Sequence, residues 1–345
     1  MNTFRQTALA VTVSAAFAFA PGAVAGGEGF VHLAGIQAPT PAADEAPSAS
    51  IDKLLAQPAD LWERLRQRFA LPAMDTKRVA EYEAWYAARP ELLRAILGRA
   101  RLYLHYIVEE VERRGLPGEL ALLPVVESGF NPRALSSAQA SGLWQFIPDT
   151  GARYKLAQTA RYDARRDVVA STDAALDYLQ SLYRMQGDWQ LALASYNWGE
   201  QAVARAVDLS RARGRGGDFG SLVLPEETRN YVPRLMAIRN IVADPAKYGV
   251  DLGELPNEPY FASVPNELDM DLRTAARLAE MPIEEFLALN PAYNRPQIPG
   301  ALRASLLVPV DRAEFLRVNL ERYREEQVRD ARSRVRATGK AKLRG

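Results

Sequence analysis

Residues 127–132 (ESGFNP) follow an apolar run at residues 121–126 (ALLPVV), and the pattern on which the fold assignment depends begins here. Glu127 is the central residue. A glutamate in an apolar surround holds its proton more tightly, because desolvation disfavours the charged form. Such an acid can donate a proton near neutral pH. The local pattern alone favours a helix-end glutamate whose carboxyl lies in water, and the segments that follow reverse that preference.

Three further segments complete the pattern. Ser136 and residues 141–150 (SGLWQFIPDT) come first, followed by residues 194–200 (ASYNWGE) and 227–232 (ETRNYV). In this order and spacing, the segments resemble the catalytic domain of soluble-type (SLT) lytic transglycosylases, the goose-lysozyme-like enzymes that cut peptidoglycan. The resemblance extends over roughly residues 50–310 and is strongest to the type-D group of membrane-bound enzymes. It implies a mainly α, lysozyme-like catalytic domain.

The resemblance also implies a reaction. Glu127 would protonate the glycosidic oxygen between N-acetylmuramic acid and N-acetylglucosamine, and would then accept the proton of the 6-hydroxyl as a 1,6-anhydro ring closes. Among the other motif residues, Glu227 and Tyr231 would support the site. The residues implied to bind the glycan are Ser136, Gly142, Gln145, Tyr196 and Asn197.

No second carboxylate has a comparable setting. Glycosidic cleavage usually takes two carboxyl groups, and Asp149, Asp163, Asp167 and Glu227 are the candidates. Asp163 and Asp167 lie among arginines, which favours structural ion pairs. A site with one carboxylate is feasible when the substrate supplies its own nucleophile.

Two alternatives stay open at this point. One is a hydrolytic muramidase on the same fold, in which an aspartate activates water. The other is a non-catalytic protein that binds the cell wall. Trp144 and Trp198 are either stacking faces for sugars or core residues.

The composition excludes several chemistries. There is no cysteine, which excludes disulfides, thiol catalysis and a lipid attached to an N-terminal cysteine. The only histidines are His32 and His105, too few for a histidine metal site or a Ser-His relay. We therefore expect no metal and no cofactor.

Residues 1–25 have the features of an export signal: a basic start at Arg5, a short apolar stretch, and a small-residue cleavage site. Residues 26–50, rich in Ala, Pro, Gly and Ser, indicate a flexible linker. We expect a periplasmic protein without a lipid anchor, and association with the cell wall or outer membrane is left open.

Charge is concentrated at the C-terminus. The net charge of the chain is +1, whereas residues 329–345 contain seven Lys or Arg and one Asp. A tail of this kind either contacts anionic envelope surfaces or is simply solvated. The expected partner is the peptidoglycan glycan strand, with no nucleic acid, and the chain is expected to be a monomer.

Apolar residues recur at helical spacing in residues 51–115, the expected N-terminal helical region. A long helix is predicted at residues 89–114, ending at Gly115. Residues 116–250 form the expected catalytic domain. Pro124 predicts a kink in a helix close to Glu127.

A separate module is predicted at residues 260–310. Strands at residues 260–264 and 305–310 flank helices at 272–279 and 283–289, which gives a β-α-α-β order. The module resembles a degenerate LysM repeat whose opening Gly-Asp-Thr is missing. Residues 311–345 would form a basic C-terminal helix or tail.

Overall fold

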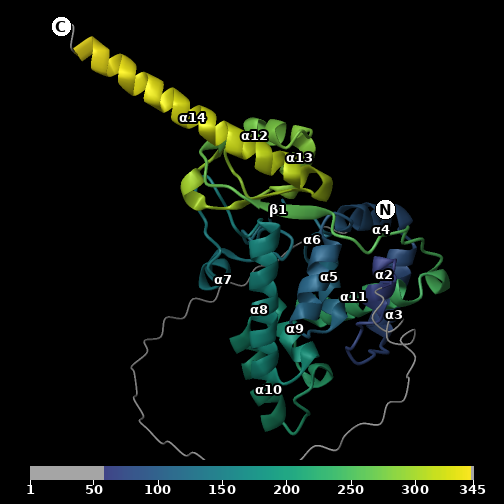
Figure 1. Ribbon diagram of the computed structural model, residues 1–345. Coiled ribbons are helices and arrows are strands. Elements are labelled where there is room, and N and C mark those ends of the chain that lie inside the picture. Colours follow the sequence, from purple (N-terminus) through teal and green to yellow (C-terminus); the bar gives the residue numbers. More distant parts are fainter. Residues whose placement is uncertain (1–57, 343–345) are drawn as a thin grey trace, which may run out of the picture. The chain divides into compact units, whose positions relative to one another are not determined.

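The computed structural model of the protein describes residues 58–342, with side chains described as far as residue 333. The expected export signal (residues 1–25), the linker (residues 26–50) and His32 lie outside the described residues. The described chain is mainly helical, with a small C-terminal module that contains strands and helices, as the sequence predicts (Figure 1). The helices before the module are α2 (Leu61–Arg66), α3 (Lys77–Ala87), α4 (Pro90–Ala100), α5 (Leu104–Arg113), η1 (Gly118–Leu122), α6 (Leu123–Ser128), α7 (Pro148–Arg153), α8 (Val168–Gln186), α9 (Trp189–Trp198), α10 (Glu200–Ala212), η2 (Phe219–Ser221), α11 (Glu226–Ala243) and η3 (Ala246–Tyr248).

Helix α11 lies at the centre of the helical part. It packs against α3, α9 and α6, and α9 in turn packs against α8 and α10. Leu235 and Ile238 on α11 are fully buried, and so are Leu191 and Leu193 on α9. Burial of such apolar faces is the main stabilising contribution in a helical domain. The packing brings α6, which carries Glu127, against α11.

Local signals in the sequence fix the ends of α8 and α9. Asp167 precedes α8, and its Oδ1 accepts a hydrogen bond from the Ala170 N–H at 2.9 Å. Asp188 caps α9 in the same way. Gly187 ends α8 with a φ of 69°, a left-handed conformation that glycine adopts without a Cβ penalty.

The expected single helix at residues 89–114 is wrong. Two helices, α4 and α5, are separated by a turn at residues 101–103. Tyr103 in this turn is buried, and its hydroxyl donates to the Ala288 carbonyl at 2.8 Å. Tertiary contacts of this kind favour a break that helical periodicity does not reveal. The predicted end is confirmed, because α5 stops at Arg113 and Gly115 has a φ of 63°.

The expected kink at Pro124 is also wrong. Pro124 lies in the first turn of α6, which begins directly after the 3-10 helix η1. A proline at this position costs no helical hydrogen bond, since the first N–H groups of a helix have no partner within it.

The C-terminal module contains the predicted β-α-α-β order, together with two short strands that were not predicted. Strand β1 (Phe261–Pro265) pairs antiparallel with β4 (Ser305–Pro309), and the short strands β2 (Met270–Asp271) and β3 (Gln297–Ile298) form a second pair. Buried Asn290 connects the end of α13 to strand β4. Its amide donates to the Leu307 carbonyl at 2.7 Å, and its Oδ1 accepts from the Leu307 N–H at 2.9 Å. The helices are α12 (Leu272–Leu278), α13 (Ile283–Leu289), η4 (Gly300–Leu302), η5 (Val310–Arg312) and α14 (Ala313–Lys342).

Main-chain hydrogen bonds connect the module to the helical part. The Asp163 N–H donates to the Ala292 carbonyl at 2.9 Å, and the Asn294 N–H donates to the Arg161 carbonyl at 2.8 Å. Residues around the end of α13 therefore contact the loop that precedes α8.

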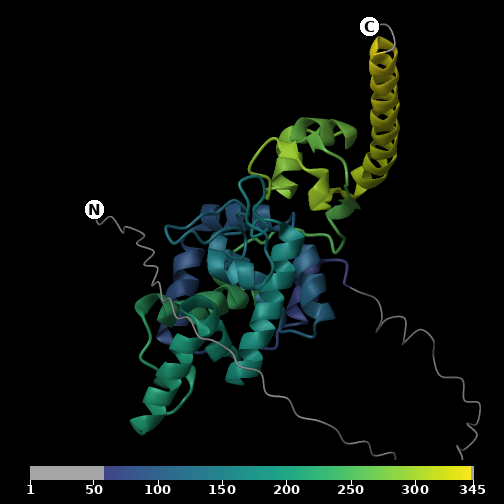
Figure 2. The ribbon, with the colours of Figure 1, turned by 90° about the vertical axis from the view of Figure 1, so that its left-hand side faces the viewer.

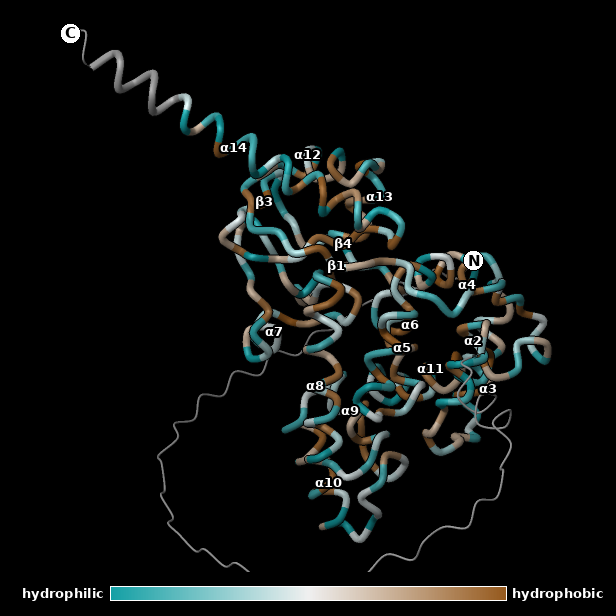
Figure 3. The backbone as a smooth tube through the Cα atoms, in the orientation of Figure 1, coloured by the Kyte–Doolittle hydropathy of each residue, from teal (hydrophilic) through white to brown (hydrophobic). Residues whose placement is uncertain are grey.

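Helix α14 continues from the module as one uninterrupted helix in both views (Figures 1 and 2). Its first turns pack against β1 and α12, whereas the later described turns are mostly hydrophilic (Figure 3). Within residues 58–342, no helix is both long enough and apolar enough to cross a membrane.

Candidate active site

Glu127 lies on the last turn of α6. Gly129 ends this helix in a left-handed conformation with a φ of 58°. The Ser128 hydroxyl donates to the Leu143 carbonyl at 2.9 Å, which ties the end of α6 to the segment around Trp144. Two of the four sequence segments are thereby held together directly beside Glu127.

The Glu127 carboxyl has few hydrogen-bond partners. Oε1 accepts a short hydrogen bond from the Tyr231 hydroxyl of α11. Within residues 58–342, no group donates to Oε2. Arg234 lies one turn further along α11, and its Nη2 donates to the Val126 carbonyl at 3.4 Å. The carboxyl therefore has one oxygen held by Tyr231 and one without a donor in the described part of the chain.

Burial raises the pKa of Glu127 from 4.5 to about 7. The Tyr231 hydrogen bond and the positive charge of Arg234 both act in the opposite direction, and the negative charge of Glu227 adds a smaller rise. Desolvation outweighs the two opposing effects because the carboxylate loses its hydration inside the fold. A carboxylic acid with a pKa near 7 can donate a proton and then accept one at neutral pH.

Tyr196 on α9 lies near this carboxyl, and Asn197 follows it in the same helix. The Tyr196 hydroxyl donates to the Trp144 carbonyl at 2.8 Å. Burial raises the Tyr196 pKa well above its ordinary value, and the negative charge of Glu127 raises it further. The Asn197 Oδ1 accepts a hydrogen bond from Thr228 of α11 at 2.8 Å. Both side chains are partly exposed, as groups that contact a ligand must be.

The loop at residues 134–146 is fixed by its own hydrogen bonds. The Ser136 hydroxyl accepts from the Ala140 N–H at 3.1 Å, and the Gln145 amide donates to the Gly142 carbonyl at 2.8 Å. Gly142 has a φ of 89°, and a Cβ there would lie 1.9 Å from the Arg165 carbonyl oxygen. The close backbone approach at Gly142 is thus to Arg165 within the protein, whereas approach of a glycan to Gly142 stays a prediction.

Comparison with known proteins identifies both parts of the chain. The family model described as "Transglycosylase SLT domain" matches residues 106–216. The model "Lytic transglycosylase MltD, LysM-like domain" matches residues 260–325. The chain contains an SLT transglycosylase domain and an MltD-type LysM-like domain.

Several curated proteins are similar to parts of this chain. Membrane-bound lytic murein transglycosylase D of Escherichia coli K12 is 37% identical over 267 residues, which is 77% of this chain and 59% of the relative. A putative tributyltin chloride resistance protein of an Alteromonas species is 50% identical over 110 residues, or 32% of this chain and 53% of the relative. Membrane-bound lytic murein transglycosylase C of Haemophilus influenzae PittGG is 30% identical over 154 residues, or 39% of this chain and 42% of the relative. The chain thus spans about three fifths of the length of the first of these relatives.

The other candidate carboxylates either have structural partners or are exposed to solvent. Asp163 forms the expected structural ion pair, with Arg165 at 2.7 Å. Asp167 caps α8 instead of pairing with an arginine. Asp149 and Glu227 are exposed, and of these only Glu227 influences the charge of Glu127.

Sequence reasoning missed two residues of the site. Arg234 and Thr228 lie one turn on either side of Tyr231 on α11, and the helical spacing from Tyr231 was the available signal.

Of the two tryptophans, Trp144 is fully buried with its Nε1 donating to Thr172, so it is a core residue. Trp198 is partly exposed and lines a pocket.

Proposed function

We propose that the protein is a peptidoglycan lytic transglycosylase of the cell envelope. The observation that carries the proposal is the carboxyl of Glu127, whose burial places its pKa at about 7 and whose Oε1 is held by Tyr231. The SLT domain and the similarity to murein transglycosylase D support the same reaction class. That relative is named as a membrane-bound enzyme, which supports an envelope location.

In the proposed reaction, protonated Glu127 donates to the glycosidic oxygen between N-acetylmuramic acid and N-acetylglucosamine. The C1–O bond breaks through an oxocarbenium-like transition state. Glu127, now ionised, accepts the proton of the muramoyl 6-hydroxyl while that oxygen bonds to C1. The product is a 1,6-anhydro sugar, and no water is consumed.

The surroundings of Glu127 support both halves of this cycle. A pKa near 7 gives comparable populations of acid and base at neutral pH. Tyr231 donates to the carboxylate and holds its orientation, and Arg234 favours the ionised form that exists after the first step. Tyr196 and Asn197 are proposed to face the acetamido group of the muramoyl ring, and Ser136, Gly142 and Gln145 to lie along the glycan. The LysM-like module is proposed as a second glycan contact.

The test is digestion of purified peptidoglycan by the wild-type protein and by Glu127→Gln, with mass spectrometry of the products. Anhydromuropeptides are expected from the wild type. Because general acid–base catalysis contributes about 10²–10⁴-fold, Glu127→Gln should lose about three orders of magnitude in rate while retaining its fold. Products with reducing-end muramic acid, heavier by one water, would show a hydrolytic muramidase. Equal product release by the two proteins would show that Glu127 is not the acid.

A further inference from the structure

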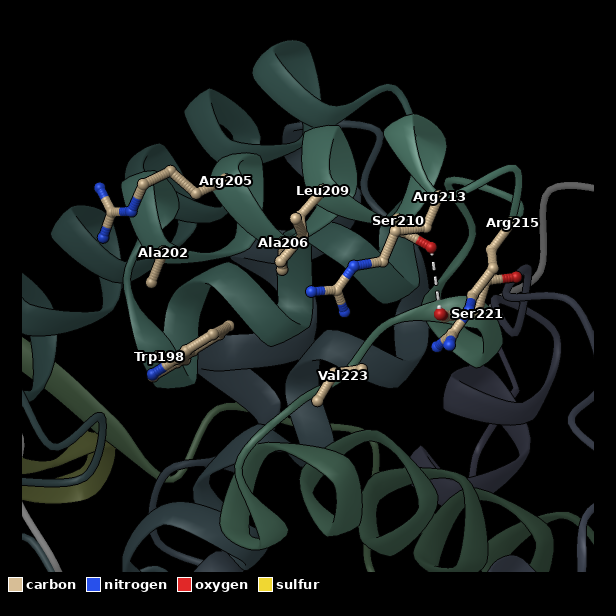
Figure 4. Close-up of a pocket in the computed structure, with 10 residues that line it drawn as sticks. All are labelled: Trp198, Ala202, Arg205, Ala206, Leu209, Ser210, Arg213, Arg215, Ser221 and Val223. Carbon is tan, nitrogen blue, oxygen red and sulfur yellow. Dashed lines mark hydrogen bonds between the residues drawn. The ribbon is translucent and has the colours of Figure 1, made fainter.

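A cationic pocket lies between α10 and the segment at residues 213–223 that leads into α11 (Figure 4). Its volume is about 260 Å³. The Ser210 hydroxyl holds its two sides together, donating to the Gly216 carbonyl at 2.7 Å and the Ser221 carbonyl at 3.1 Å. The lining residues that matter here are Trp198, Arg205, Leu209, Arg213, Arg215 and Val223.

Arg205, Arg213 and Arg215 are all exposed, and within the described part of the chain none of them has a carboxylate within ion-pair distance. Figure 4 shows Arg213 reaching into the pocket between Leu209 and Val223.

Two acids of the neighbouring segments have other partners, whereas the exposed Asp208 on α10 forms no ion pair within the described residues. Asp218 accepts hydrogen bonds from the Ser221 N–H and hydroxyl, and Glu200 pairs with Arg153 at 2.8 Å. Three unpaired guanidinium groups around one cavity favour a ligand with carboxylates.

The pocket also presents apolar surface. Leu209 is 49% exposed and Val223 is 61% exposed, although both are large aliphatic residues. Trp198 contributes a partly exposed indole at one end. An inorganic anion would leave this surface in water. A ligand that carries carboxylates together with aliphatic groups matches both features.

Two residues of the pocket wall, Trp198 and Val223, are close in the chain to the candidate active site. Trp198 follows Asn197 in the chain, and Val223 lies just before α11, which carries Thr228 and Tyr231. Thr228 of α11 donates a hydrogen bond to Asn197 of α9, which ties together the two helices next to Trp198 and Val223. A group attached to a sugar beside Asn197 would therefore have a short path into the pocket.

We infer that this pocket binds the carboxylate-bearing stem peptide of the glycan strand whose muramoyl ring lies at Glu127. The inference rests on the proposed function. Stem peptides are attached to muramic acid through its lactyl group and carry free carboxylates and alanine methyl groups. Carboxylates pair with Arg213 and Arg215, and the aliphatic part packs against Leu209 and Val223. The pocket thus makes the enzyme prefer strands that retain their peptides.

The experiment compares two substrates: peptide-bearing strands, and strands from which an amidase has removed the stem peptides. The double variant Arg213→Gln/Arg215→Gln is set beside the wild type and a matched control, Arg101→Gln/Arg184→Gln, in which two exposed arginines of the helical part without ion pairs are changed away from the pocket. The arginine-pocket variant should show about a tenfold rise in KM on peptide-bearing strands. Its kcat, and its KM on peptide-free strands, should match those of the wild type.

Binding of a soluble disaccharide-tetrapeptide to Glu127→Gln, with and without the two pocket substitutions, gives a second readout that needs no turnover. A loss of binding only with the pocket substitutions supports the inference. Equal KM values for all proteins on both substrates, or equal changes on both, overturn it. A wild type that cuts neither substrate yet binds the disaccharide-tetrapeptide through these arginines would refute the proposed function alone.

Discussion

Two glutamates in consecutive short helices show what separates a structural carboxylate from a candidate acid. Glu119 in η1 is fully buried, and Glu127 in α6 is partly accessible at the site. Glu119 comes just before the apolar run at residues 121–126, and Glu127 comes directly after it. They differ in what their oxygens contact.

Both oxygens of Glu119 are occupied. Oε2 accepts from the Ala70 N–H and Oε1 from the Leu71 N–H, each at 3.0 Å, and the Arg239 guanidinium lies 3.7 Å away. This carboxylate joins the segment after α2 to α11. Glu127 has one hydroxyl donor on one oxygen. Burial alone therefore does not mark a catalytic acid; burial combined with an unoccupied oxygen does.

The largest effect on stability is expected for Glu119→Ala. The substitution leaves two backbone N–H groups and Arg239 without their buried acceptor, and breaking a buried ion pair in this way costs about 3–5 kcal/mol. Denaturant unfolding measures the loss. Glu91→Ala is the control, because Glu91 pairs with Arg94 on the surface and should cost under about 1 kcal/mol. Similar values for the two variants would show that Glu119 is no structural anchor.

A smaller effect, dependent on pH, is expected for Glu127→Gln. Because the pKa of Glu127 is about 7 in the fold against 4.5 ordinarily, the folded state binds the proton more tightly. The wild type therefore loses stability as the pH rises from 4.5 through 7, by about 1–3 kcal/mol. Glu127→Gln has no ionisable group at this position, so its stability should not fall in this way as the pH rises.

Unfolding free energies of both proteins at pH 5 and pH 8 check this expectation. Glu127→Gln should be close to the wild type at pH 5 and more stable than the wild type at pH 8. Glu91→Gln, an exposed change, serves as the control and should not alter the pH dependence. A constant difference between Glu127→Gln and the wild type across this range would mean that Glu127 does not titrate there.

The sequence was sufficient for features that depend on local pattern. The paired strands β1 and β4 and the helices α12 and α13 follow from alternation and helical spacing over short segments. The apolar run before Glu127 predicted its desolvation, and the burial that raises its pKa has that cause.

Features that depend on distant contacts could not be predicted. The break between α4 and α5 accompanies burial of Tyr103 against a carbonyl in the C-terminal module. The need for glycine at position 142 arises from the Arg165 backbone, and the anchoring of Glu119 arises from backbone groups before α3. Each contact joins residues far apart in the chain, so no local window contains both partners.

The smallest effect is expected for Tyr231→Phe, which tests the hydrogen bond that the Glu127 carboxyl accepts from Tyr231. That bond lowers the pKa of Glu127, so its removal should raise the pKa further. Since a net hydrogen bond contributes about 0.5–1.5 kcal/mol, the shift should not exceed about one pH unit. The alkaline limb of the kcat/KM profile, where the acid loses its proton, should move to higher pH.

Tyr162→Phe is the matched control for this variant. Tyr162 is also buried and also donates to a carboxylate, Asp167, at 2.5 Å. A general effect of losing a buried tyrosine hydroxyl would alter both variants alike. A shift of the pH profile in Tyr231→Phe alone would show that Tyr231 acts through Glu127. Unchanged pH profiles in both variants would mean that the Tyr231 hydroxyl does not set the protonation of Glu127 during turnover. The contrast between Glu127 and Glu119 would then rest on burial and on the unoccupied oxygen of Glu127 alone.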